Sequence, residues 1–149
     1  MSSATLKKII PCKKDQLVKM VLDIEKYPEF VPWCLEGKIH QKKDMSDMLE
    51  IEADLTVGKK FLNQTYKSHV TYYKAKDKII VSNIGGPLSY LQNEWEIREV
   101  NNQSEVSFKI DFELKNIFYN MIMKKSFDQG LRNIADAFEK RAISLFKNT

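Results

Sequence analysis

Apolar and polar residues alternate without a break along two segments, which predicts two strands with one buried and one solvent-exposed face. One segment covers residues 49–57, where Gly58 should mark the following turn, and the other covers residues 106–114. Runs of strand-forming residues predict further strands at residues 5–10, 36–41, 61–73, 78–83 and 91–100. Asn101-Asn102 follows the last of these, so we predict a hairpin with the strand at 106–114. The pattern therefore predicts about seven antiparallel strands.

Two other segments carry apolar residues at helical spacing. The shorter covers residues 13–26 and should stop at Pro28, because proline cannot continue a helix. The longer covers residues 117–146 and contains Gly130, which indicates close packing or free space beside the helix. An antiparallel sheet with one apolar face needs a cover, and only this final helix is long enough to provide one. We therefore predict one α+β domain over residues 1–149, with a curved sheet wrapped around the final helix and an apolar cavity between them.

The composition is that of a globular domain, with 149 residues of which 43% are hydrophobic and 30% are charged. The net charge of +4 comes from dispersed lysine pairs, which are typical of a solvated surface, with weak attraction to anionic lipid or RNA as the alternative. Because no dense basic stripe with interleaved aromatic residues is present, we expect no DNA partner. The N-terminus has no apolar signal core and no apolar stretch matches a bilayer, which favours a cytoplasmic and, from its Lys, Ile and Asn richness, bacterial protein.

The residues that most often carry out chemistry are sparse. Cys12 and Cys34 stand alone, as do His40 and His69, so the sequence offers no cluster of four ligands for a structural metal. The two cysteines are expected to be reduced core thiols. We find no paired acid and base and no activated nucleophile, which argues against an enzyme and against a catalytic cofactor.

The segment from residue 27 to residue 34 reads YPEFVPWC and joins two features that seldom occur together. Its two prolines exclude a regular helix or a central strand. Yet Phe30, Val31 and Trp33 are residue types that normally lie inside a protein. The segment is therefore either a hydrophobic corner that closes the first helix or a rigid wall beside a cavity.

The sequence DIEKYPEFVPWC at residues 23–34 resembles the signature of the coenzyme Q-binding START-domain family, which also includes bacterial ribosome-association toxins. Residues 68–70, 86–95 and 127–142 support the resemblance in the expected order along the chain. The resemblance implies a helix-grip fold, as in START and Bet v 1-like proteins, with a lipid-sized tunnel between sheet and helix. It implies binding of ubiquinone, a ubiquinone precursor or another polyprenyl lipid, without catalysis, in support of coenzyme Q biosynthesis or delivery.

Two alternatives remain open. The toxin members of the family imply association with the ribosomal large subunit and a block of subunit association. Related helix-grip folds also include cyclases and hydrolases, so the second and weaker alternative is an enzyme with a hydrophobic substrate.

The residues expected to line the tunnel are core types, and each could equally be ordinary core. They are Phe30, Val31, Trp33, Leu55, Val57, Tyr66, Val70, Asn93, Trp95, Phe108, Ile110, Phe127, Leu131 and Ile134. Tyr66 and Asn93 are the candidates for hydrogen bonds to the quinone oxygens.

A polyprenyl ligand must be collected from a membrane, and residues 117–125 read IFYNMIMKK, which combines apolar residues with a basic end. We predict membrane contact through Phe118, Met123, Lys124 and Lys125. The alternative is that these are the first buried turns of the final helix. The expected location is the cytoplasm at the inner membrane of a bacterium, or the mitochondrial inner membrane if the source is eukaryotic.

Overall fold

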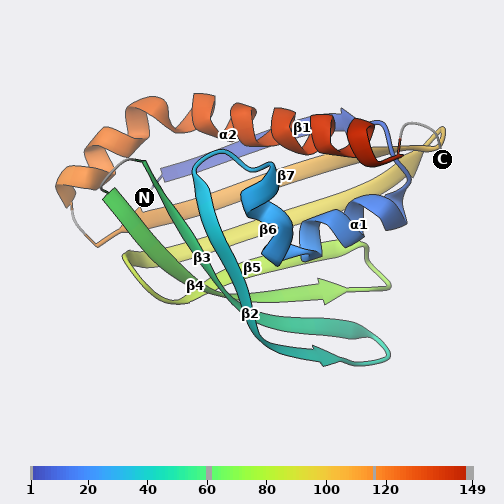
Figure 1. Cartoon of the computed structure of the whole chain (residues 1–149), viewed down its shortest axis with the longest axis horizontal. Helices are drawn as coiled ribbons and strands as arrows, with labels where there is room; N and C mark the ends of the chain where they lie inside the picture. Colours follow the sequence, from blue (N-terminus) through green and yellow to red (C-terminus); the bar gives the residue numbers. More distant parts are fainter. Residues whose placement is uncertain (1, 60–61, 116, 147–149) are drawn as a thin grey trace.

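The fold is a seven-stranded antiparallel sheet that curves around one long helix (Figure 1). The computed structural model describes residues 2–59, 62–115 and 117–146, including their side chains except at residues 2, 59, 62, 114 and 117–127. The strands are β1 (Ser2–Ile10), β2 (Cys34–Asp44), β3 (Met48–Lys59), β4 (Leu62–Tyr73), β5 (Lys78–Gly85), β6 (Leu88–Val100) and β7 (Gln103–Leu114). The helices are α1 (Lys14–Leu22), the 3-10 helix η1 (Ile24–Glu29) and α2 (Ile117–Phe146). The sheet order β1-β7-β6-β5-β4-β3-β2 confirms the predicted helix-grip fold.

The residues between β5 and β6 and between β6 and β7 adopt left-handed backbone conformations. Asn101 and Asn102 adopt φ of 54° and 64°, the left-handed pair that a two-residue hairpin turn requires. The β6–β7 hairpin predicted from alternation is therefore confirmed, with Trp95 opposite Phe108 and Ile97 opposite Val106. Gly86 has φ of 105° between β5 and β6, and β5 runs to Gly85, two residues past its predicted end at residue 83.

The prediction of one helix over residues 13–26 is wrong, because α1 ends at Leu22 and η1 carries the chain on through Pro28. The Tyr27 hydroxyl donates a hydrogen bond to the Val21 carbonyl. In a continuing α-helix that carbonyl would accept from the backbone of Glu25. The aromatic side chain thus replaces a helical bond and turns the chain into the tighter 3-10 geometry.

The predicted turn at Gly58 is also wrong, because β3 continues to Lys59. The Gly58 amide donates to the carbonyl of Trp33 at 3.0 Å and so attaches the strand to the corner that precedes β2. This hydrogen bond uses only the backbone of Gly58, which every residue type except proline could provide.

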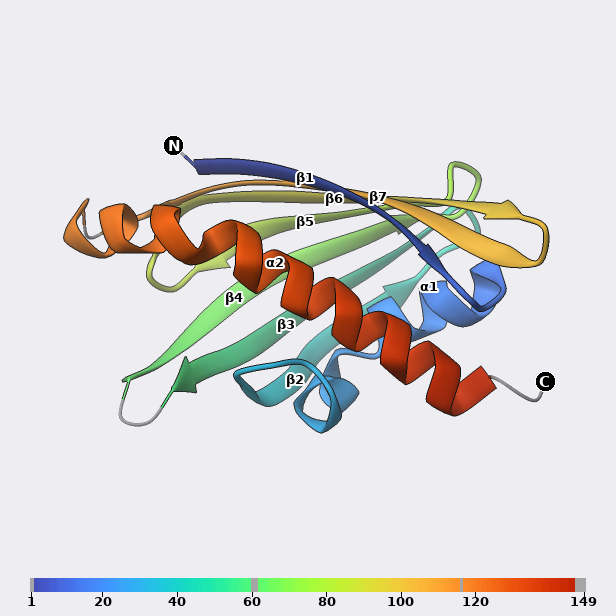
Figure 2. The ribbon, with the colours of Figure 1, turned by 90° about the horizontal axis from the view of Figure 1, so that it is seen from above.

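Helix α2 runs diagonally across the concave face of the sheet (Figure 2). Leu131, Phe138 and Ala142 are buried against the sheet and belong to the same core cluster as Ile51 and Trp95. The half-buried Lys8 of β1 bonds Asp136 at 2.8 Å, and the half-buried Arg141 bonds Glu29 of η1 at 2.7 Å. Both ion pairs tie the second half of α2 to its neighbours.

Candidate functional site

The concave face contains a patch of half-buried residues that we call the floor. It is made of Leu55, Val57, Tyr66, Val81, Asn93 and Ile110, which come from β3, β4, β5, β6 and β7. The strand register places these side chains on one face, since Leu55 pairs with Tyr66 and Asn93 pairs with both Val81 and Ile110. Strand alternation thus assembles a mostly apolar surface from segments far apart in the sequence.

Burial changes along each strand where the floor begins. On β3, Ile51 and Ala53 are buried, whereas Leu55 and Val57 remain half-buried. On β7, Phe108 is buried and Ile110 is half-buried, but Phe112 beyond it is buried again. The floor is therefore not the fraying end of the sheet: on β7 it lies between two well-packed regions.

An aromatic cluster closes one side of the floor. Trp95 packs edge-on against Phe108 with ring centroids 5.0 Å apart, and against Phe138 of α2 at 5.4 Å. Phe138 also contacts Phe30 at 5.0 Å and Tyr27 at 5.7 Å. Edge-to-face aromatic pairs add stabilisation beyond simple burial. Strand β6 therefore passes from this sealed cluster at Trp95 directly to the half-buried Asn93 of the floor.

The floor carries two polar side chains, those of Asn93 and Tyr66. The Asn93 Oδ1 is buried and has no hydrogen-bond partner among the described residues. Burial raises the pKa of the Tyr66 phenol, so this hydroxyl stays protonated and able to donate at neutral pH. A ligand with polar groups of its own could form hydrogen bonds with both side chains.

The corner beside η1 places Trp33 at the rim rather than in the core. Trp33 adopts φ of 61°, a left-handed conformation that is uncommon for a bulky residue. Its side chain is 44% exposed, and a methyl group built on Gly130 of α2 would lie 3.9 Å from its indole. That is an ordinary van der Waals distance, so the indole lies beside Gly130 without requiring glycine at this position. The close packing or free space predicted beside this glycine stays a prediction.

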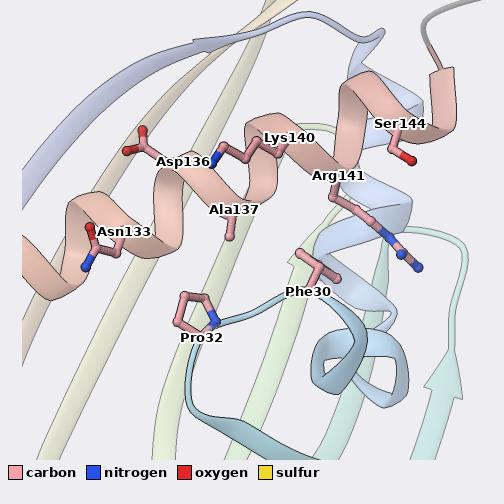
Figure 3. A pocket seen from close by; sticks show the side chains of 8 residues that line it. All are labelled: Phe30, Pro32, Asn133, Asp136, Ala137, Lys140, Arg141 and Ser144. Carbon is pink, nitrogen blue, oxygen red and sulfur yellow. The ribbon is translucent and has the colours of Figure 1, made fainter.

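A groove of about 570 Å³ lies between α2 and the corner (Figure 3). Its apolar walls are Phe30, Pro32 and Ala137, and the Arg141 guanidinium stacks on Phe30 at 5.1 Å. Hydrogen bonding to Arg141 lowers the pKa of Glu29, so this ion pair forms a charged rim. The groove is separate from the floor. A second groove, of about 490 Å³, is lined by residues of β1, β6 and β7, including Glu94 and Lys109.

The sulfur and imidazole groups show no catalytic arrangement. Burial raises the pKa of the Cys12 thiol to about 11 and raises that of the Cys34 thiol, so both remain unreactive thiols at neutral pH. The His40 Nε2 lies 2.8 Å from the Asp54 carboxylate. These two residues alternate with the concave positions of β2 and β3, so the pair does not lie on the concave face. Within the described ranges, no group of three or more His, Cys, Asp and Glu residues is placed to hold a metal.

The structure brings many of the predicted ligand residues together but gives them different surroundings. Leu55, Val57, Tyr66, Asn93 and Ile110 form the floor, and Ile134 of α2 is also half-buried. Val70, Trp95, Phe108 and Leu131 are buried in the core cluster, and Phe30, Val31, Leu55, Ile110 and Ile134 are partly buried and pack against it. The side chains of Phe127, Phe118, Met123, Lys124 and Lys125 lie outside the described residues.

Sequence reasoning missed Val81, which lies on the floor between Val70 and Asn93. The run Ile79-Ile80-Val81 is apolar throughout and therefore carries no alternation from which to assign a face. Only the register with β4 and β6 shows which of these residues point inward. The predicted tunnel remains a prediction, since neither of the two grooves lies over the floor.

Residues 10–139 match the family described as polyketide cyclase / dehydrase and lipid transport. The ribosome association toxin RatA of Rickettsia prowazekii (strain Madrid E) is 29% identical over 143 residues, which cover 94% of this chain and 95% of that protein. The mitochondrial coenzyme Q-binding protein COQ10 of Dictyostelium discoideum is 29% identical over 136 residues, or 89% of this chain and 64% of that protein.

The solution structure of the 18 kDa protein CC1736 from Caulobacter crescentus has a TM-score of 0.80 and 28% identity, and the likeness covers 97% of this chain and 98% of that one. The resemblance read from residues 23–34 therefore agrees with relatives of both named kinds. With a match over most of its length and the same helix-grip architecture, the chain belongs to the polyketide cyclase / dehydrase and lipid transport family.

Proposed function

We propose that the chain binds ubiquinone, a ubiquinone precursor or a similar polyprenyl lipid over the floor, and that it supports coenzyme Q biosynthesis or delivery for respiration. The main support for this proposal is the floor, whose mostly apolar residues are half-buried under α2, whereas the neighbouring residues on the same strands are buried. A polyprenyl tail would cover the apolar positions, and burial of apolar surface contributes about 25 cal/mol per Å². A relative of this chain bears the name coenzyme Q-binding protein.

We also propose that the chain acts by binding and not by catalysis. The family description includes cyclases and dehydrases, so catalysis is a real alternative. Against it, the polar groups of the floor are a protonated phenol and a neutral amide. Neither is the acid–base pair or activated nucleophile that such chemistry needs.

The direct test is extraction of the purified protein with organic solvent followed by mass spectrometry. A quinone or quinone precursor should be recovered in a stoichiometric amount after expression in a cell that makes ubiquinone. Recovery of no polyprenyl lipid, together with failure of added ubiquinone to bind, would contradict the proposal.

A second candidate function is association with the ribosome, with a block of subunit association through the large subunit. Its support is the match to a protein named ribosome association toxin, which extends over 95% of that protein. The chain spans only 64% of the coenzyme Q-binding relative from Dictyostelium. Co-sedimentation of lipid-free protein with ribosomal subunits would favour this candidate over the first.

Replacing Trp33 with alanine should weaken retention of a bound polyprenyl quinone by about tenfold, or about 1.4 kcal/mol. The free energy of unfolding should change by less than about 1 kcal/mol, because the side chain is 44% exposed. Quinone content per folded molecule and urea unfolding provide the two measurements. Leu35→Ala, at a residue 53% exposed, is the matched control and should retain quinone normally. A loss of stability without a loss of retention would show that Trp33 serves only the corner.

Membrane contact at the start of α2 remains a prediction. In the described part of the chain, no helix is long and apolar enough to span a bilayer. Replacing Phe118 and Met123 together with alanine should lower liposome binding by about tenfold, since each buried methylene contributes about 0.8 kcal/mol. Flotation with vesicles that contain anionic lipid would measure the change. The control is the double alanine variant at Ile143 and Leu145, which are exposed near the other end of α2; equal losses in both variants would contradict a specific membrane segment.

A further inference from the structure

The two asparagines on the concave side of β5 and β6 differ in how their amides are held. Asn83 donates from Nδ2 to the Leu88 carbonyl at 3.2 Å and accepts at Oδ1 from the Leu91 amide at 2.9 Å. Asn93 has a buried Oδ1 without a partner, and no hydrogen bond joins its amide to any residue that the structure describes. Hydrogen bonds therefore hold the Asn83 amide in one orientation, whereas none from a described residue holds the Asn93 amide.

The surroundings of Asn93 make its free amide unusual. Its neighbours across β5 and β7 are Val81 and Ile110, and Trp95 follows on the same face of β6. A polar atom buried among apolar side chains without a partner costs free energy, and water or a ligand must supply what the protein does not. Asn93 is half-buried overall, although its Oδ1 is itself buried.

An asparagine amide offers a donor on one side and an acceptor on the other, and a half turn exchanges them. For Asn83 that turn would break two hydrogen bonds, but for Asn93 it breaks none. A quinone carbonyl can only accept a hydrogen bond, while the hydroxyl of the reduced quinol can donate one. The Asn93 side chain can therefore hydrogen-bond to the quinone or to the quinol without breaking a hydrogen bond to any described residue.

We propose that Asn93 contacts the head group of the bound quinone and that its amide, which no hydrogen bond to a described residue holds in place, lets the floor hold the oxidised and reduced forms with similar affinity. This inference rests on the proposed quinone binding. In the sheet order, β6 is three strands from β3, where Val57 lies toward the Trp33 corner. In this arrangement the head group lies at β6 and the polyprenyl tail extends across the sheet toward the corner.

The test compares dissociation constants for a ubiquinone with two isoprene units and for its quinol, measured without oxygen. The wild-type protein should bind both forms within about threefold of each other, with a ratio that does not change between about pH 6 and pH 9. Asn93→Leu should weaken both forms by about tenfold or more, because it removes donor and acceptor together. Thermal unfolding of each variant checks that it is folded.

Asn93→Asp provides the sharper readout. An ionised carboxylate only accepts hydrogen bonds, so this variant should come to prefer the quinol as pH rises, by about tenfold or more once the carboxylate is ionised. Asn83→Leu is the comparison at the fixed amide, and it should lower thermal stability without changing the ratio of the two affinities.

A wild-type preference of more than about tenfold for one oxidation state would overturn the inference and leave quinone binding intact. Unchanged affinities in Asn93→Leu, or an unchanged ratio at all pH values in Asn93→Asp, would overturn it as well. Absence of binding for both forms to the wild-type protein would overturn the proposed function along with the inference.

Discussion

Replacing Phe138 with alanine is expected to lower the free energy of unfolding by about 3–5 kcal/mol. Phe138 is only 2% exposed and joins α2 to both the sheet and the corner. Its ring lies 5.0 Å from that of Phe30, 5.7 Å from Tyr27 and 5.4 Å from Trp95. Loss of the ring removes three aromatic contacts and leaves a cavity where α2 packs against the corner.

Urea or guanidinium unfolding would measure this loss. Phe138→Leu is the matched control, since it keeps most of the apolar volume and should cost clearly less than alanine. A loss of less than about 1 kcal/mol in Phe138→Ala would contradict the view that this ring holds the helix to the sheet. Such a result would mean that the neighbouring side chains close the cavity.

Replacing Gly37 with alanine is expected to cost about 2–3 kcal/mol through overpacking. Gly37 lies on β2, where a methyl group would stand 2.2 Å from the backbone oxygen of Ile24 in η1. A backbone atom cannot rotate away as a side chain can, so η1 and β2 would have to separate. This glycine pairs with Leu55 of the floor, so the shift would also reach the proposed ligand site.

The control for Gly37 is Gly85→Ala on β5. A methyl group there would lie 3.3 Å from the Cδ of Lys67, at a flexible side chain that can move. Its free energy of unfolding should change by no more than about 0.5 kcal/mol. Equal losses in the two variants would show that the close approach of η1 to β2 is not what requires glycine at residue 37.

Alternation along the chain was enough to predict most of the sheet. The apolar positions of β3 and β7 face the helix as predicted, and the Asn101-Asn102 turn joins β6 to β7. Local signals were less reliable where a tertiary contact replaced a local one. The Tyr27 hydroxyl donates a hydrogen bond to the Val21 carbonyl where α1 ends. The Gly58 amide donates to the Trp33 carbonyl, and β3 continues past the expected turn.

The candidate site could be predicted only in part. A period of two shows which side chains share a face of the sheet, and it put Leu55 on the same face as the buried Ile51, and Asn93 on the same face as the buried Trp95. It does not show what lies above each side chain. Whether an apolar residue becomes sealed core, like Trp95, or half-buried floor, like Ile110, depends on where α2 crosses the sheet.

The sequence by itself therefore determined the order of elements, the face of most strand residues and the family, because these depend on local periodicity and on a contiguous motif. Only tertiary packing places Trp33 at an exposed rim and leaves the buried Oδ1 of Asn93 without a partner among the described residues. Exposure and hydrogen-bond satisfaction depend on neighbours that are distant in sequence. A residue's own chemistry fixes what it can bind, but only the packing around it decides what it is left free to bind.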